Sequence, residues 1–132
     1  LLPLLENTIL FSNVNPTKDH WLGTEAGIAG VSYTFVISKT YVRIELTILN
    51  SSKETNKIYF KKLYKNKEAI EQSFGSILVW EELPDNKMSR IKIEDQGVNI
   101  YNESDWETMN TFLVSNLPKF EKAFTPFIKE LK

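Results

Sequence analysis

The chain has 132 residues, of which 42% are hydrophobic and 25% are charged, a composition typical of one folded domain rather than of a disordered segment. Its 16 basic and 17 acidic residues give a formal net charge of -1, so any nucleic-acid surface must be local. Because cysteine is absent, disulfides, thiolate nucleophiles and sulfur-ligated metals are excluded, and a cytoplasmic setting is favoured.

The first 30 residues are expected to form a short helix and a structured loop. Apolar residues recur at helical spacing between Pro3 and Phe11, and polar residues interrupt them too often for this segment to span a membrane. Residues 12–30 are rich in Asn and Gly and contain Trp21, which predicts a loop pinned by its tryptophan. Because the chain starts at Leu1 rather than Met, we expect it to be the C-terminal part of a longer protein.

A β-hairpin is predicted next. Apolar residues alternate with mostly polar residues between Val31 and Ile37, and again between Val42 and Ile48, with a corner at residues 38–40. This period of two is typical of half-buried strands. The hairpin should therefore have one apolar face and one polar face.

A helix is predicted to follow, capped by Ser51 or Ser52 and running to about Phe74, where Gly75 ends it. Lysines that should face solvent make this helix the candidate nucleic-acid surface: Lys53, Lys57, Lys61, Lys62 and Lys65. The same lysines could serve solubility alone, because glutamates dilute their charge.

The last part of the chain is predicted to hold a second hairpin and a long helix. Strands at 77–82 and 89–94 flank a Pro-Asp-Asn turn. Ser104 and Glu107 fit a capping box for a helix whose apolar stripe continues to the end, and its prolines should kink or divide it.

This order of elements predicts a single α+β domain. Residues 31–132 should form a ββαββα core, in which two ββα units build a four-stranded antiparallel sheet with helices packed on one face. Residues 1–30 would add the N-terminal helix and loop.

Three motifs that could carry chemistry do not fit their sequence context. His20 is the single histidine, which leaves no pair of histidines for a metal and argues against a histidine base. The glycines between 23 and 30 precede a strand and lack the lysine of a phosphate-binding loop, so they should serve a close backbone approach. Asp85 to Lys87 matches a nuclease PD-(D/E)XK triplet only within a turn. No catalytic, cofactor or metal site is predicted.

The outward face of the predicted sheet is the candidate ligand-binding surface. Arg43 and Arg90 stand in mid-strand, where a planar guanidinium suits a carboxylate or phosphate. The candidate residues taken from the strands are Tyr33, Arg43, Glu45, Arg90 and Lys92. These positions also fit a solvated face with cross-strand ion pairs, and both interpretations stay open.

Five segments carry a family resemblance: 16–21, 27–33, 42–46, 80–83 and 89–91. Together they resemble a bacterial domain of unknown function, whose members often follow a PD-(D/E)XK-like nuclease domain in a longer protein. The resemblance covers nearly the whole chain. It implies an accessory role in a cytoplasmic DNA-processing or defence protein, and it assigns no catalytic residue. Lys18 and Asp19 are polar positions within the matching segments, and they join the ligand-binding candidates.

Three functions remain open. The first is a noncatalytic accessory domain that recognises nucleic acid or positions a nuclease domain of the same chain. The second is a protein-interaction or homodimerisation domain that uses an apolar C-terminal stripe containing Phe120, Phe124, Phe127, Ile128 and Leu131. The third is a small-anion binder or an enzyme of unknown activity that uses Arg43 and its neighbours.

Overall fold

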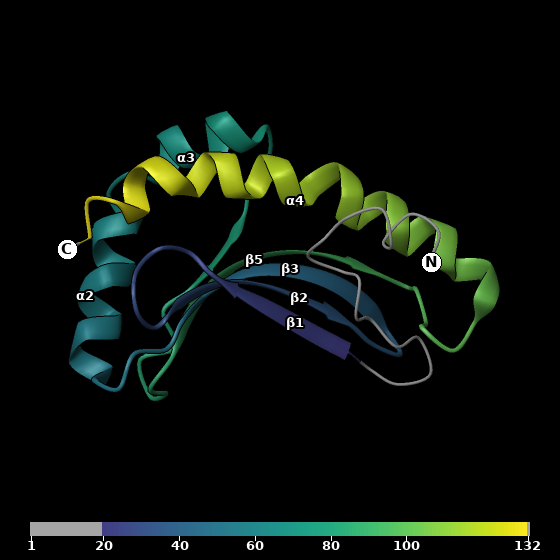
Figure 1. Ribbon diagram of the computed structural model, residues 1–132, viewed down its shortest axis with the longest axis horizontal. Coiled ribbons are helices and arrows are strands. Elements are labelled where there is room, and N and C mark those ends of the chain that lie inside the picture. The colour runs from purple at the N-terminus through teal and green to yellow at the C-terminus, as the bar shows by residue number, and fades with distance from the viewer. Residues whose placement is uncertain (1–19, 132) are drawn as a thin grey trace.

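The computed structural model describes residues 20–131, and its centre is a five-stranded antiparallel sheet (Figure 1). The strand order is β1-β2-β3-β5-β4. The strands are β1 (His20–Glu25), β2 (Val31–Ile37), β3 (Tyr41–Ile48), β4 (Val79–Glu81) and β5 (Ser89–Gln96). The helices are α2 (Lys53–Tyr64), α3 (Lys67–Phe74), the 3-10 helix η2 (Glu103–Asp105) and α4 (Trp106–Ile128).

The predicted α+β fold is confirmed. All four predicted strands are present as β2 to β5, and they form the two predicted hairpins, which meet where β3 pairs with β5. The helices lie on one side of the sheet: α4 curves along the covered face, α2 stands at one end, and α3 packs against α4 (Figure 1).

The core lies between the sheet and the helices. Alternate residues of β2 are buried, which is the pattern expected of a strand with one covered face. In β3 the same alternation holds, except that Glu45 on the opposite face is buried as well. From α4, Phe120 and Phe124 pack at a ring-centre distance of 4.7 Å, and Phe120 also meets Tyr33 and Phe74 edge-on. Each such side chain stabilises the fold by about 1.5–3 kcal/mol through burial of apolar surface.

The loop predicted for residues 12–30 is wrong at residues 20–25, where β1 forms, whereas residues 26–30 are a turn into β2. This strand pairs along its whole length with β2, with Gly23 opposite Thr34. The glycine and the polar residues of this segment gave no alternating apolar pattern, so the sequence did not indicate a strand. An edge strand can form without that pattern, because it depends on hydrogen bonds to its neighbour more than on its own composition. The predicted helix from Pro3 to Phe11 lies outside the described residues.

The helix predicted between residues 51 and 74 is in fact two helices. Ser52 caps α2, accepting a hydrogen bond from the Thr55 N–H at 3.2 Å, and Gly75 ends α3 in the left-handed conformation with φ 99°, as predicted. The break falls at Lys65 and Asn66, because Asn66 leaves helical geometry with φ -107° and ψ 18°. This change of direction lets α3 pack on α4 while α2 stays at the end of the sheet (Figure 1).

The capping box predicted for the last helix is wrong, because a 3-10 turn precedes the helix. The Asn102 side chain accepts the Ser104 N–H at 3.2 Å, and α4 begins at Trp106, whose indole N–H donates to Ile100 O at 2.7 Å. Pro118 and Pro126 do not divide α4, which is continuous to Ile128. Among the helices of residues 20–131, none is long and apolar enough to cross a membrane.

Gly30 marks the place where the start of β2 touches the end of β3. A Cβ at this position would lie 2.7 Å from the Asn50 Cα, and Gly30 O accepts the Leu49 N–H at 2.7 Å. Its φ of 80° also favours glycine. The prediction that this glycine serves a close backbone approach is confirmed.

Candidate functional site

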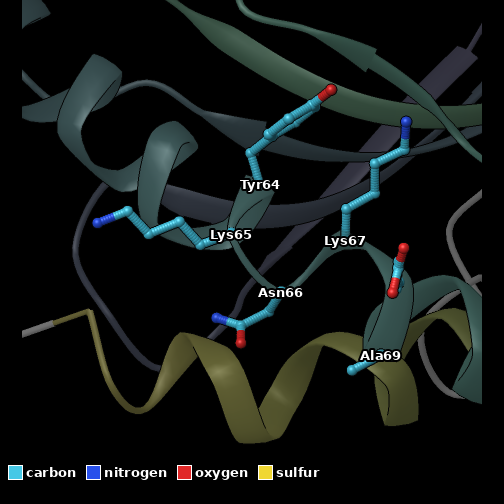
Figure 2. Close-up of a pocket in the computed structure, with 6 residues that line it drawn as sticks. Tyr64, Lys65, Asn66, Lys67 and Ala69 are labelled. Atoms are coloured by element: carbon cyan, nitrogen blue, oxygen red, sulfur yellow. The ribbon is translucent and has the colours of Figure 1, made fainter.

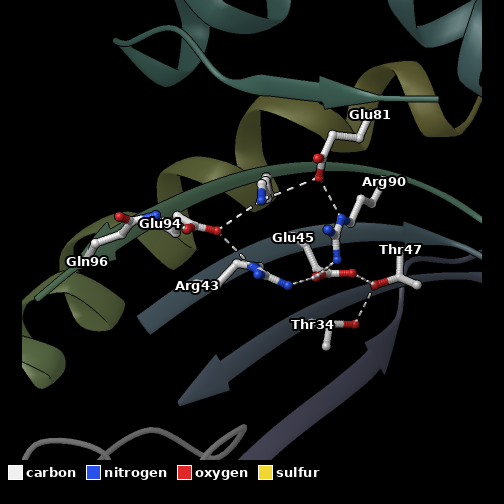
Figure 3. A network of polar contacts seen from close by, with 9 residues as sticks. Thr34, Arg43, Glu45, Thr47, Glu81, Arg90, Glu94 and Gln96 are labelled. Carbon is white, nitrogen blue, oxygen red and sulfur yellow. Dashed lines mark hydrogen bonds and ion pairs between the residues drawn. The ribbon is translucent and has the colours of Figure 1, made fainter. Parts of the chain in front are cut away.

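A ring of six charged side chains lies over β3, β5 and β4 on the sheet face opposite the helices (Figure 3). Strand register places them together, since Arg43 stands opposite Glu94, Glu45 opposite Lys92, and Glu81 opposite Arg90. The charged ring consists of Arg43 and Glu45 from β3, Glu81 from β4, and Arg90, Lys92 and Glu94 from β5.

The charges of the ring alternate in sign around a closed circuit. Its shortest contacts join Arg90 Nε to Glu81 Oε1 at 2.6 Å, Lys92 Nζ to Glu94 Oε1 at 3.0 Å, and Arg43 Nε to the same Glu94 oxygen at 3.1 Å. Lys92 to Glu81 at 3.4 Å, Arg43 to Glu45 at 3.4 Å, and Arg90 to Glu45 at 3.8 Å close the circuit. Three cations and three carboxylates therefore sum to zero formal charge.

The ring is partly buried, and the pKa values of two of its glutamates, Glu81 and Glu94, are lowered. Side-chain exposures run from 6% for Glu45 to 26% for Glu81. Burial alone would raise the pKa of Glu94, but hydrogen bonds from Gln96, Lys92 and Arg43 lower it to about 2. Burial likewise opposes ionisation of Glu81, and its bonds with Arg90 and Lys92 lower its pKa.

The charged ring contains four of the residues that the sequence predicted as ligand-binding candidates on this face. The structure brings Arg43, Glu45, Arg90 and Lys92 together, and each of the three cations already has two carboxylate partners. A free anion would have to displace these glutamates. The arrangement matches the cross-strand ion pairs of the alternative interpretation.

The other ligand-binding candidates are not part of the ring. Tyr33 lies on the helix-covered face, where its hydroxyl is 2.9 Å from Thr125 Oγ1 in α4. Burial raises the pKa of the Tyr33 hydroxyl, which therefore stays protonated. Lys18 and Asp19 lie outside the described residues.

Lys57 is partly buried rather than exposed as predicted, because its ammonium is directed at backbone carbonyls. Its ammonium donates to Glu82 O at 2.6 Å, Met88 O at 2.7 Å and Leu83 O at 2.8 Å, and it lies 3.0 Å from Ser89 Oγ. The connection between β4 and β5 folds against α2 and supplies these acceptors. Burial lowers the pKa of Lys57, and the side chain ties two elements together.

The other predicted lysines are exposed, three on α2 and Lys65 directly after its end. Within residues 20–131, no ion pair involves Lys53, Lys62 or Lys65, and Lys61 approaches Glu82 only at 3.9 Å with 70% of its side chain exposed. Lys53 lies at the N-terminal end of the helix, far along it from the other three. The junction with α3 adds Lys67, and we call Lys61, Lys62, Lys65 and Lys67 the lysine surface.

A shallow depression of about 460 Å³ lies at the α2–α3 junction, beside the lysine surface (Figure 2). Tyr64 borders it, with a residue exposure of 48%. Lys67 extends alongside the Tyr64 ring, with its ammonium 5.3 Å from the ring centre, and Lys65 points to the other side (Figure 2). The lining residues are Tyr64, Lys65, Asn66, Lys67, Glu68 and Ala69. The depression exists because the predicted single helix is broken, so sequence patterns gave no signal for it.

Within the described part of the chain, no cluster of three or more histidine, cysteine or acidic residues could hold a metal ion. The fold and its two charged surfaces define an antiparallel α+β domain with a neutral charged ring on the sheet and a basic surface on a helix junction. The chain belongs to the family described as Domain of unknown function (DUF4268), whose model matches residues 3–128. Neither the comparison with curated proteins nor that with solved structures gives a match.

Proposed function

We propose that this chain is a noncatalytic accessory domain of a longer bacterial DNA-processing or defence protein, and that it binds nucleic acid through the lysine surface. The observation that supports the proposal is that every cation of the charged ring has carboxylate partners, whereas Lys62 and Lys65 of the lysine surface have no ion pair within residues 20–131. Unpaired lysines on an exposed helix can neutralise phosphates without first breaking another contact.

The two other functions have less support from the packing. The apolar C-terminal residues proposed for dimerisation are largely buried in the domain's own core, as Phe120, Phe124 and Ile128 are each at most 2% exposed. A small anion at Arg43 or Arg90 would compete with carboxylates held at 2.6–3.8 Å.

In the proposed function, the accessory domain positions a nuclease domain of the same protein on its substrate.

Fluorescence anisotropy with labelled single-stranded DNA, duplex DNA and RNA at about 50 mM salt tests the proposal, since binding through phosphates is strongest at low salt. The test variant replaces the four lysines of the lysine surface with glutamine. A matched control replaces four exposed lysines elsewhere: Lys87, Lys119, Lys122 and Lys129. Both variants lose the same charge.

The lysine-surface variant should bind at least tenfold more weakly than the unmodified chain, and the control should change less than threefold, because only the former loses phosphate contacts. Equal losses in the two variants would show that net charge alone governs binding. That result, or no binding by the unmodified chain to any of the three probes, would rule the proposal out.

A further inference from the structure

Tyr64 is an exposed aromatic residue whose ring is held in place. Its ring stacks on Phe60 with an interplanar angle of 25° at 6.1 Å, and it meets Trp80 edge-on at 5.6 Å. Trp80 is in turn fixed by an indole hydrogen bond to the Glu71 carboxylate at 3.1 Å. A ring oriented in this way loses little conformational entropy when a flat group stacks on it.

The exposed side of Tyr64 is occupied by a group that can move away. Lys67 holds its ammonium 5.3 Å from the ring centre, within the range of a cation–π contact. At an exposed site this contact is weaker than the stacking of a nucleobase on an aromatic ring. A base could therefore replace the ammonium, and the long side chain of Lys67 would then be free to reach a phosphate.

The surroundings of Tyr64 fit a strand that crosses the helix junction. The depression of about 460 Å³ gives room for a flat group beside the ring. Lys65 and Lys67 extend to different sides of Tyr64 (Figure 2), so phosphates that flank a stacked base would each have a cation. In a duplex the faces of the bases are already stacked on one another, and only an unpaired base can offer a face to Tyr64.

We infer that the lysine surface takes single-stranded nucleic acid, with one unpaired base stacked on Tyr64 and the adjoining phosphates at Lys65 and Lys67. This inference rests on the proposed function and specifies the ligand of the same site. Stacking on one side chain reads no base edge, so the site accepts the bases with little discrimination.

The first experiment leaves the protein unchanged and alters the ligand. Anisotropy compares a single strand of thymidines, a strand of uridines, an abasic strand of the same length and charge, and a fully paired blunt-ended duplex. Loss of one stacked base should weaken binding of the abasic strand about 5- to 100-fold relative to the thymidine strand. Equal affinity for the abasic and thymidine strands would overturn the inference, and the uridine arm shows whether RNA serves as well as DNA.

The second experiment changes the ring. Tyr64→Leu should lose affinity for the thymidine strand about 5- to 100-fold and for the duplex less than twofold, while Tyr64→Phe keeps the ring and the affinity. Tyr101→Leu is the matched control, because Tyr101 is 51% exposed and has the Lys39 ammonium 5.7 Å from its ring centre. It should leave binding unchanged.

The outcomes separate the two proposals. If Tyr64→Leu weakens single strand and duplex equally, or weakens neither, the stacking inference is wrong, and the proposed function stands as long as the lysine-surface variant still loses binding. If the lysine-surface variant binds like the unmodified chain, the proposed function is wrong as well.

Discussion

Glu94 shows how strongly local partners control a single carboxylate in this protein. One of its oxygens receives Lys92 at 3.0 Å and Arg43 at 3.1 Å, and the other receives Gln96 at 2.8 Å. Burial works against the charge, yet these three donors together bring the pKa from 4.5 to about 2. The folded state therefore binds the Glu94 proton less readily than the unfolded chain does.

Glu94→Gln should accordingly lower stability in a pH-dependent way. Because the pKa is depressed on folding, the stabilisation by Glu94 is fully present above about pH 4.5 and is lost as the pH falls to about 2. We expect a loss of about 1–3 kcal/mol at pH 7 that shrinks toward zero near pH 2. Urea unfolding at several pH values measures it. The exposed Glu130→Gln serves as control, and a loss for Glu94→Gln that stays constant with pH would contradict the prediction.

The positions of the ring residues on β3 and β5 could be predicted from sequence, but the place of Glu81 and the pairing of the six could not. The period of two placed Arg43, Glu45, Arg90 and Lys92 on the outward face. Their contacts depend on the register between β3 and β5, which α2 and α3 separate in the chain. A shift of one residue would turn every side chain of a strand to the other face, and local sequence does not fix a register between distant strands.

Among the elements, α2 depends most on a neighbour that local sequence did not reveal. Its exposed lysines followed from helical spacing, but Lys57 reaches the connection between β4 and β5. That connection holds Leu83 at φ 54°, a left-handed conformation that is unfavourable for a leucine. The carbonyls of Glu82, Leu83 and Met88 all accept from Lys57, so this one side chain fixes the turn.

Lys57→Met should destabilise the fold by about 2–3 kcal/mol, because it leaves partly buried carbonyls without their charged donor while keeping the aliphatic length. Lys53→Met, at an exposed position of the same helix, should change stability by less than about 0.5 kcal/mol. The midpoint and slope of urea unfolding measure both variants. Equal stability of the two would show that the ammonium contacts contribute nothing to the fold.

The element boundaries that were wrong have two physical causes. The 3-10 turn before α4 is held by short-range hydrogen bonds, in which Asn102 accepts the Ser104 N–H and Asp105 accepts the Asn99 N–H. The strand β1 instead depends on its pairing with β2, and the break at Asn66 accompanies the packing of α3 on α4. Local propensity is a weak guide at such places, because tertiary packing overrides it. The long apolar stripes of β2, β3 and α4 were predicted well, since burial of a whole face leaves a strong periodic signal.

Across the whole molecule, charge is distributed unevenly although the formal sum is -1. The charged ring cancels its own six charges, and the lysine surface gathers four cations at one helix junction. Binding through the lysine surface should therefore release few counterions. Affinity should be modest and sensitive to salt.

The expected salt dependence can be stated as a slope. Four lysines that neutralise four phosphates of a single strand should give a slope of roughly -3 when the logarithm of the association constant is plotted against that of the salt concentration. Anisotropy titrations between 50 and 200 mM salt, roughly the range over which such slopes are taken, measure it. The lysine-surface variant should give a slope near zero. A slope steeper than about -6 for the unmodified chain would place most of the contacts elsewhere.

The position of α4 after all the strands has a consequence for the making of the protein. A ribosome produces β2, β3 and β5 before it produces the helix that covers their apolar side. The hydrogen bond between Tyr33 and Thr125 spans 92 residues, so that side of the sheet cannot be closed until synthesis has passed the end of the last helix. During this interval the apolar face of the sheet is exposed on the nascent chain. We therefore expect the yield of folded protein in cells to depend on chaperones that shield apolar surfaces.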